Sequence, residues 1–162
     1  IMQSDGSSPI NLTQHPRPDI RPRYSPVGNL ILFESTRDEN YEIYTMAVNG
    51  SNQTNLTQHA GFDWQPQFSP AGDKIMFEST RNGNYELYIM DTDGYNLVNL
   101  TNSPGKDFRG NFAPDGSRIT FTSFRDENFE IYMVDIDGTK LVNVSNRPDN
   151  TDYSSSFQPW PN

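Results

Sequence analysis

The sequence predicts an all-β protein, a β-propeller built from four-stranded antiparallel blades. The first observation is a repeat, because Pro22, Pro66 and Gly110 stand 44 residues apart and begin closely similar segments. The second is that each copy contains four short β-type segments separated by turn sequences. Repeats of about this length with four strands each are typical of propeller blades. We therefore predict one propeller domain over 1–162, with whole repeats at 22–65, 66–109 and 110–154 and partial ones at 1–21 and 155–162.

The first strand of each copy is predicted around an aromatic residue, which is Tyr24, Phe68 or Phe112. A tight turn follows it directly, as in Pro70-Ala71-Gly72. Proline presets φ in such a turn and glycine accepts a positive φ, so the chain can reverse there.

The second and third strands are predicted from their apolar patterns. Alternating apolar residues indicate second strands over 30–35, 74–79 and 118–123. The segments 41–46, 85–90 and 129–134 are apolar on both faces, which predicts third strands buried between layers. Fourth strands are expected around Leu56, Leu100 and Val144, each reached through an Asn-Gly or Asp-Gly hairpin turn.

The two ends of the chain are predicted to hold pieces of blades. Residues 1–21 align with 45–65, which predicts the end of a third strand and a complete fourth. Residues 155–162 align with a first strand and its turn. Together they lack the second strand and most of the third, so they cannot form a normal blade, and closed rings have about 4 to 8 blades. We expect a larger ring, completed by further chain or by a second copy in a homodimer.

The repeat motif reads S-P-x-G-x-x-I-x-F-x-S-x-R, then E-[IL]-Y-x-M-D-x-D-G and L-T, and in the central copy it runs from Ser69 to Thr101. This motif resembles the repeat of the TolB-type β-propellers, which are related to the tryptophan-aspartate repeat propellers. The resemblance implies an exported, periplasmic or extracellular protein. It also implies a noncatalytic binding scaffold that engages a peptide or protein through its end-face loops and channel mouth. The alternatives are the propeller portion of a prolyl oligopeptidase-like peptidase, a propeller-fold lyase, or an adhesion array.

Composition excludes several other classes of function. The net charge is −9 and the 12 basic residues are scattered, so we do not expect nucleic acid as a partner. Cysteine is absent, and no apolar run approaches membrane-spanning length. No Gly-x-Ser-x-Gly, phosphate-loop or His-Glu-x-x-His motif occurs, so neither catalytic residues nor a cofactor are predicted. The Asp91-x-Asp93-Gly94 segment fits a hairpin turn better than a calcium loop, and no metal site is expected.

Two charged positions recur once per repeat. An aspartate precedes each first strand and an arginine follows each second strand, and antiparallel topology places both at the same end of the blades. The members are Asp19, Asp63, Asp107 and Asp152, and Arg37, Arg81 and Arg125. We expect charge-assisted pairs between them. We favour a structural role as staples between blades, because a residue needed in every blade is usually architectural; the alternative is a collar that binds a ligand at the channel mouth.

An aromatic residue follows the recurring aspartate in three copies, as Trp64, Phe108 and Tyr153. Rings beside a carboxylate at a channel mouth suit stacking against a peptide or a sugar. These three residues are therefore the best candidates for ligand contact. The competing interpretation is that they wedge between blades.

Overall fold

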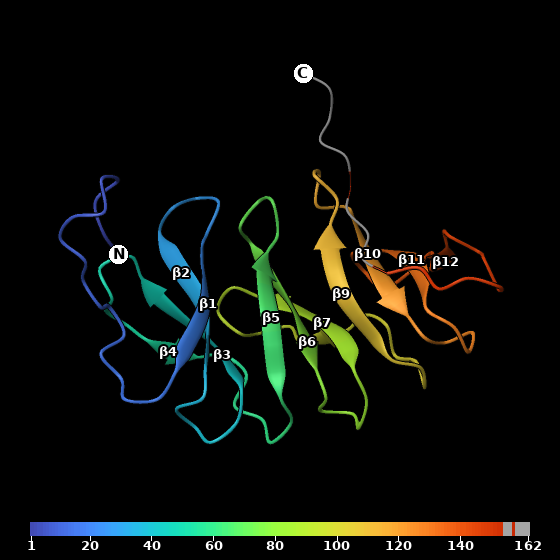
Figure 1. Ribbon diagram of the computed structural model, residues 1–162, viewed down its shortest axis with the longest axis horizontal. Helices are drawn as coiled ribbons and strands as arrows, with labels where there is room; N and C mark the ends of the chain where they lie inside the picture. The colour runs from blue at the N-terminus through green and yellow to red at the C-terminus, as the bar shows by residue number, and fades with distance from the viewer. Residues whose placement is uncertain (154–156, 158–162) are drawn as a thin grey trace.

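The chain forms three four-stranded antiparallel sheets that stand side by side, as the computed structural model shows (Figure 1). The structure describes residues 1–153 and 157, and no helix occurs among them. The strands of the first sheet are β1 (Asp19–Tyr24), β2 (Leu30–Ser35), β3 (Glu42–Ala47) and β4 (Thr54–Asn55). Those of the middle sheet are β5 (Asp63–Phe68), β6 (Lys74–Ser79), β7 (Glu86–Asp91) and β8 (Val98–Asn99). Those of the last sheet are β9 (Asp107–Phe112), β10 (Arg118–Ser123), β11 (Glu130–Asp135) and β12 (Val142–Asn143).

The predicted fold class is confirmed, and so are the bounds of the second strands. The third strands begin and end one residue later than predicted. The residues directly before them, Tyr41, Tyr85 and Phe129, take part in ring contacts at the end of the sheets. Within each sheet the strands follow chain order, so every connection is a hairpin. The outermost strands β4, β8 and β12 have two residues each, which leaves little free edge for nonspecific strand pairing.

The predicted tight turns close the first hairpin of every sheet. In the middle sheet the Gly72 amide donates to the Ser69 carbonyl at 2.9 Å, and Gly72 adopts a positive φ of 74°. The last sheet carries Ala113 in place of the serine, and the same backbone bond still forms there from Gly116, also at 2.9 Å. The serine hydroxyl adds further bonds to the turn, since Ser69 donates to the Asp73 side chain at 2.7 Å and accepts from the Asp73 and Lys74 amides.

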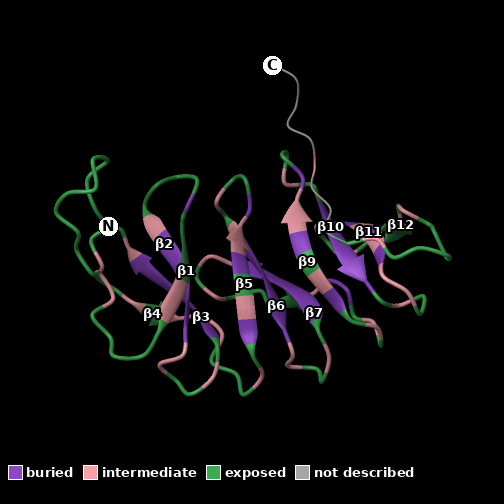
Figure 2. Cartoon of the chain, in the orientation of Figure 1, coloured by how far each residue is buried: buried purple, intermediate pink, exposed green. Residues whose placement is uncertain are grey.

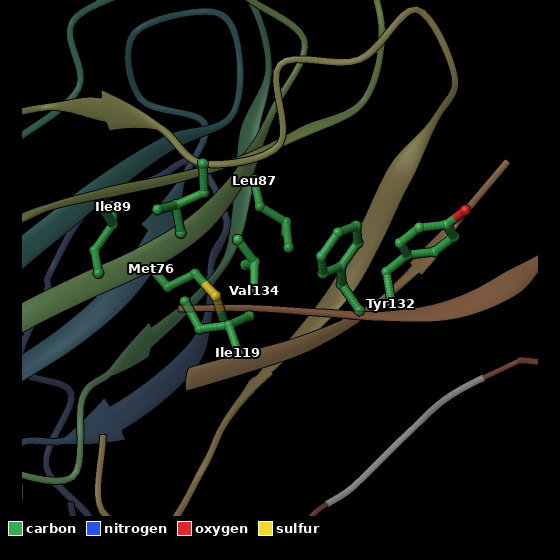
Figure 3. Packing of buried hydrophobic residues seen from close by; sticks show 8 residues of the cluster. Met76, Leu87, Ile89, Ile119, Tyr132 and Val134 are labelled. Carbon is green, nitrogen blue, oxygen red and sulfur yellow. The ribbon is translucent and has the colours of Figure 1, made fainter. Parts of the chain in front are cut away.

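The sheets pack face to face through two apolar clusters. Between the first and middle sheets the cluster contains Leu32, Ile43, Ile75, Phe77, Tyr88 and Met90. Between the middle and last sheets it contains Met76, Leu87, Ile89, Leu100, Ile119, Phe121, Tyr132 and Val134 (Figure 3). Successive residues of one strand therefore face opposite interfaces, as Ile75 and Met76 do in β6. Burying a side chain of this size contributes roughly 1.5–3 kcal/mol, so each blade is stabilised mainly by its neighbours.

Burial is concentrated in the central strands and falls off toward the loops (Figure 2). The free face of the first sheet carries a third cluster of Ile31, Phe33, Tyr44 and Met46, against which Leu12 packs. The free face of the last sheet is more polar and includes Thr120 and Thr122 in β10.

The amino-terminal segment differs from the prediction. Residues 1–18 form no strand, although a turn does form where expected, with Gly6 donating to the Gln3 carbonyl at 2.9 Å. The physical reason is that third and fourth strands need a second strand to pair with, and this segment has none beside it. At the other end, the strand expected over 155–162 lies outside the described residues, except for Phe157.

Candidate functional site

The recurring aspartates and arginines meet at one end of the sheets, which is the lower end in the view of Figure 1. Each aspartate begins the first strand of a sheet, and each arginine follows the second strand of the same sheet. Arg37 donates through Nη2 to both carboxylate oxygens of Asp19 at 3.0 Å. Arg81 and Arg125 each donate to one oxygen, of Asp63 and Asp107 respectively, at 2.9 Å.

These pairs lie within one sheet, which corrects the expectation that they staple neighbouring blades. The reason is the hairpin register, because Asp63 is paired with Ser79 across β5 and β6 and Arg81 follows two residues later. The Arg81 Nε donates to the Ser79 hydroxyl at 2.9 Å, so its Nε and Nη2 edge is fully used. Its Cζ also lies 4.8 Å from the centroid of the Tyr88 ring, within the range of a cation–π contact.

Asp152 occupies the equivalent position after the last sheet. Its amide donates to the Phe129 carbonyl at 2.7 Å, as the Asp63 amide donates to the Tyr41 carbonyl at 2.9 Å. Its Oδ2 is buried and has no hydrogen-bond partner among residues 1–153 and 157. Asp152 thus makes the same backbone contact as Asp63, and none of the ion pairs found among residues 1–153 and 157 involves it.

Burial sets the electrostatics of the aspartates. Burial raises the pKa of Asp63 and Asp107, against the opposing effect of Ser79 and Arg81 or of Ser123 and Arg125. Burial also opposes ionisation of Asp19, but hydrogen bonds from Ser35, Thr13 and Arg37 outweigh it, so the pKa of Asp19 lies below its usual value.

A set of aromatic rings lies beside the ion pairs at the same end, and we call it the aromatic band. Its first cluster is Tyr41, Phe62, Trp64 and Tyr85, in which neighbouring rings lie 6.3, 6.3 and 5.3 Å apart between centroids. Its second cluster is Phe108, Phe124, Phe129 and Tyr153, with centroid separations of 4.8–5.6 Å. The Lys106 ammonium lies 5.7 Å from the Tyr85 centroid, beside the first cluster.

Several rings of the aromatic band face solvent. Phe62 is 50% exposed, Tyr41 and Tyr85 are 38% exposed, and Tyr153 is 53% exposed. Trp64 and Phe108 are partly buried, and the Trp64 Nε1 donates to Glu78 at 2.9 Å. The predicted candidates Trp64, Phe108 and Tyr153 are therefore brought together with further rings that sequence analysis did not single out. The signal for those rings is their position at a strand end: Tyr41, Tyr85 and Phe129 directly before a third strand, Phe62 before the recurring aspartate and Phe124 directly after a second strand.

Sequence analysis also missed two buried glutamates, Glu34 and Glu78. They lie inside the apolar second strands and are 0% and 3% exposed. Each accepts a backbone hydrogen bond from the first strand of the next sheet, from Gln65 at 2.7 Å or from Arg109 at 2.6 Å. Burial raises the pKa of Glu78, although the bonds from Arg109 and Trp64 oppose this. A charged residue recurring in an otherwise apolar strand was the available signal.

The donors to these glutamates sit in β-bulges of the first strands. Gln65 and Arg109 adopt positive φ values of 51° and 57°, and Arg21 does the same at 51° in the first sheet. The strand registers are interrupted there, as between Trp64 and Gln67. A bulge turns the amide away from its own sheet, which lets it reach the preceding one. These bonds link neighbouring sheets, as does the bond from the Gln67 side chain to the Gly110 carbonyl at 2.7 Å, so they take the role predicted for the aspartates and arginines.

The loops at this end are held by a recurring asparagine. The Asn84 side-chain amide donates to the Ser103 and Gly105 carbonyls at 2.8 and 2.9 Å, and Asn40 makes the equivalent bonds. This end of the sheets thus combines aromatic rings with loops that are held by side-chain hydrogen bonds.

Among the described residues, no group of three or more His, Asp or Glu side chains is placed to hold a metal ion. Asp91, in the loop that resembles a calcium site, instead binds Lys74 at 2.5 Å.

Comparison with known proteins agrees with this architecture. The TolB structure from Acinetobacter baumannii is 28% identical over 87% of this chain, with a TM-score of 0.73. A TolB-like protein from Agrobacterium tumefaciens is 24% identical over 82%, with a TM-score of 0.69. The chain spans 35% and 50% of those two structures. An oligogalacturonate lyase from Vibrio parahaemolyticus shares the fold at 17% identity and a TM-score of 0.64, over 82% of this chain and 42% of the lyase.

No curated protein shows significant similarity to the chain. Within the described part of the chain, no helix is long and apolar enough to cross a membrane. The sequence profile of the TolB beta propeller domain matches residues 1–159, which is nearly the whole chain. Together with the three four-stranded sheets, this match shows that the chain belongs to the TolB beta propeller domain family.

Proposed function

We propose that this chain is a noncatalytic binding scaffold that holds a peptide segment of another protein against the aromatic band. The single observation that carries the proposal is the exposure of Tyr41, Phe62, Tyr85 and Tyr153 together at one end of the sheets. Exposed aromatic rings grouped in this way are typical of interaction sites, because large rings contribute much of the binding energy when a partner covers them.

The rigidity of the surface supports this function. The rings stand on strand ends and on loops fixed by Asn40 and Asn84, so little conformational entropy is lost on binding. In this proposal the Asp–Arg pairs are structural supports, and only the aromatic residues of the predicted site contact the ligand. The net charge of −9 makes nucleic acid a poor partner.

Membership of the TolB beta propeller domain family supports a proposal on where the protein works. We propose that the protein works in the periplasm or outside the cell, as expected from its resemblance to TolB-type propellers. We also propose that its ring is completed by further blades, whether from the same polypeptide or from a second copy. Size-exclusion chromatography coupled to light scattering separates these cases, since a homodimer doubles the mass of the 162-residue chain.

A displayed library of random dodecapeptides tests the binding function. The library is selected on the immobilised chain, and enriched peptides are titrated against the wild type, Phe62→Ala and Tyr95→Ala. Tyr95 is the matched control, because it is 71% exposed and lies in the hairpin between β7 and β8. We expect Phe62→Ala to weaken binding about tenfold or more and Tyr95→Ala to leave it unchanged. Failure to enrich any peptide, or the opposite ordering of the two variants, would overturn the proposal.

A further inference from the structure

Arg21 differs from the recurring arginines in how its guanidinium is used. It lies in the bulge of β1, and its side chain is 53% exposed. Its Nη1 alone donates to both oxygens of Glu34, at 3.0 and 2.8 Å. The Glu34 side chain is fully buried and also accepts the Gln65 amide. Glu34 therefore fixes the position of Arg21 without being reachable itself.

The remaining edge of the Arg21 guanidinium is open. In Arg37, Arg81 and Arg125 the edge formed by Nε and Nη2 is filled by a serine hydroxyl and an aspartate. In Arg21 the same edge has no hydrogen-bond partner among residues 1–153 and 157. Two parallel N–H donors in this geometry match the two oxygens of a carboxylate.

A cavity of about 340 Å³ lies beside Arg21, between the first and middle sheets. It is lined by Arg21, Glu34, Tyr41, Phe62, Trp64 and Gln65. The Phe62 ring is inclined at 63° to Tyr41 and at 55° to Trp64, so the rings form an angled wall and not a flat platform. Such a wall suits an apolar side chain that enters between the rings.

We propose that this cavity receives the carboxyl-terminal residue of an extended peptide. The free carboxylate binds the Nε and Nη2 edge of Arg21, and the apolar side chain packs among Tyr41, Phe62 and Trp64. The inference rests on the proposed peptide-binding function and specifies which part of the peptide is recognised. A sugar acid fits less well, because sugars stack on flat ring faces and the Trp64 Nε1 is already committed to Glu78.

Local contacts must carry this recognition, because the protein as a whole is acidic and does not attract anions from a distance. Glu34 also offsets the charge of Arg21, so the carboxylate is selected by hydrogen-bond geometry more than by net charge. Lysine at position 21 would keep the ion pair with Glu34 but would lack the two parallel donors.

Isothermal titration calorimetry with two peptides tests the inference. The probes are acetyl-Gly-Ser-Gly-Ser-Gly-Phe as the free acid and the same peptide as the carboxyl-terminal amide. We expect the free acid to bind wild type about tenfold more tightly, which corresponds to one good charge-assisted contact of about 1.4 kcal/mol. Arg21→Gln and Arg21→Lys should both remove this preference, and Arg17→Gln should retain it as the matched loss of an exposed arginine.

The following outcomes would contradict the inference. Equal binding of acid and amide, or a preference that survives in both Arg21 variants, would overturn it. If neither peptide binds while library peptides still do, recognition of the terminus fails and the proposed function stands. Trigalacturonate binding that depends on Arg21, without peptide binding, would assign the cavity to a sugar acid. Thermal unfolding of Arg21→Lys checks that the fold is intact when Arg21→Gln proves unstable.

Discussion

The first and middle sheets carry the same ion pair in different surroundings. The side chains of Asp63 and Arg81 in the middle sheet are 0% and 9% exposed, whereas those of Asp19 and Arg37 are 8% and 14% exposed. Asp19 receives two bonds from its arginine, but Asp63 receives one and keeps a buried oxygen without a partner in the described chain. The repeat therefore determines which residues pair, while the neighbouring sheets determine the energy of the pair.

The same contrast appears in the apolar faces. The middle sheet has a packed sheet on each side, so all its core residues are covered. The free face of the first sheet is covered only in part by the amino-terminal segment, which leaves a cavity of about 450 Å³. Its lining includes Ile1, Met2, Ile10, Leu12, Ile31, Phe33 and Met46. A blade of this protein is thus a unit of sequence whose stability depends on having two neighbours.

The largest difference is expected when the arginine is removed from each sheet. Arg81→Ala leaves the buried Asp63 without its cation, and breaking a buried pair in this way costs about 3–5 kcal/mol. Arg37→Ala should lower the free energy of unfolding by at least about 1 kcal/mol less than Arg81→Ala does, because water can reach Asp19 more easily. Urea denaturation of both variants measures this difference.

Peptide binding provides the control for Arg81→Ala. Arg81 does not line the cavity beside Arg21, so a variant that is still folded should bind the library peptides with unchanged affinity. Loss of binding without loss of stability would instead make the ion pairs part of the ligand site. Equal costs for the two arginine variants would contradict the role assigned to the neighbouring sheets.

A smaller loss of stability is expected from a substitution in the loop that leads into the first strand of a sheet. A Cβ at Gly61 would meet the backbone N and Cα of Arg81 at 2.8 and 2.9 Å, and Gly61 has no positive φ. Gly61→Ala should therefore destabilise by about 1–3 kcal/mol through overpacking. Arg17 holds the same repeat position before the first sheet and already carries a Cβ, so Arg17→Ala is the matched control with little expected change. The midpoints of thermal unfolding are measured for both variants. Equal shifts for Gly61→Ala and Arg17→Ala would contradict the role of the close contact at Gly61.

Much of the fold could be predicted from the repeat, because strands and turns depend on local patterns. The bounds of the second strands and the gathering of aspartates and arginines at one end are confirmed. The links between sheets could not be predicted, since the residues that adopt a positive φ in the bulges, Arg21, Gln65 and Arg109, are not glycines. Whether those aspartates, arginines and aromatic residues contact a ligand stays a prediction.

The amino-terminal segment shows a second limit of prediction from the repeat. Residues 1–21 match the sequence of a third and a fourth strand, yet a strand forms only where a partner strand offers hydrogen bonds. The turn and the packing of Leu12 form there because they depend on local chemistry and on the neighbouring sheet. Sequence similarity between repeats therefore predicts local structure better than it predicts pairing at the ends of an array.

The smallest expected effect concerns pH. As pH rises, the stability contributed by Asp63 and that contributed by Asp19 should change in opposite directions. The pKa of Asp63 is raised above the ordinary value of 3.8, so its contribution to stability is lost as pH rises through the folded-state pKa. The pKa of Asp19 is lowered, so its contribution is present above 3.8 and is lost as pH falls through the folded-state pKa. The free energy of unfolding of wild type, Asp63→Asn and Asp19→Asn is measured between about pH 3 and pH 7. The advantage of wild type over Asp63→Asn should shrink with rising pH, and its advantage over Asp19→Asn should grow. The same sign for both would mean that the greater burial of Asp63 does not control the ionisation of the aspartate.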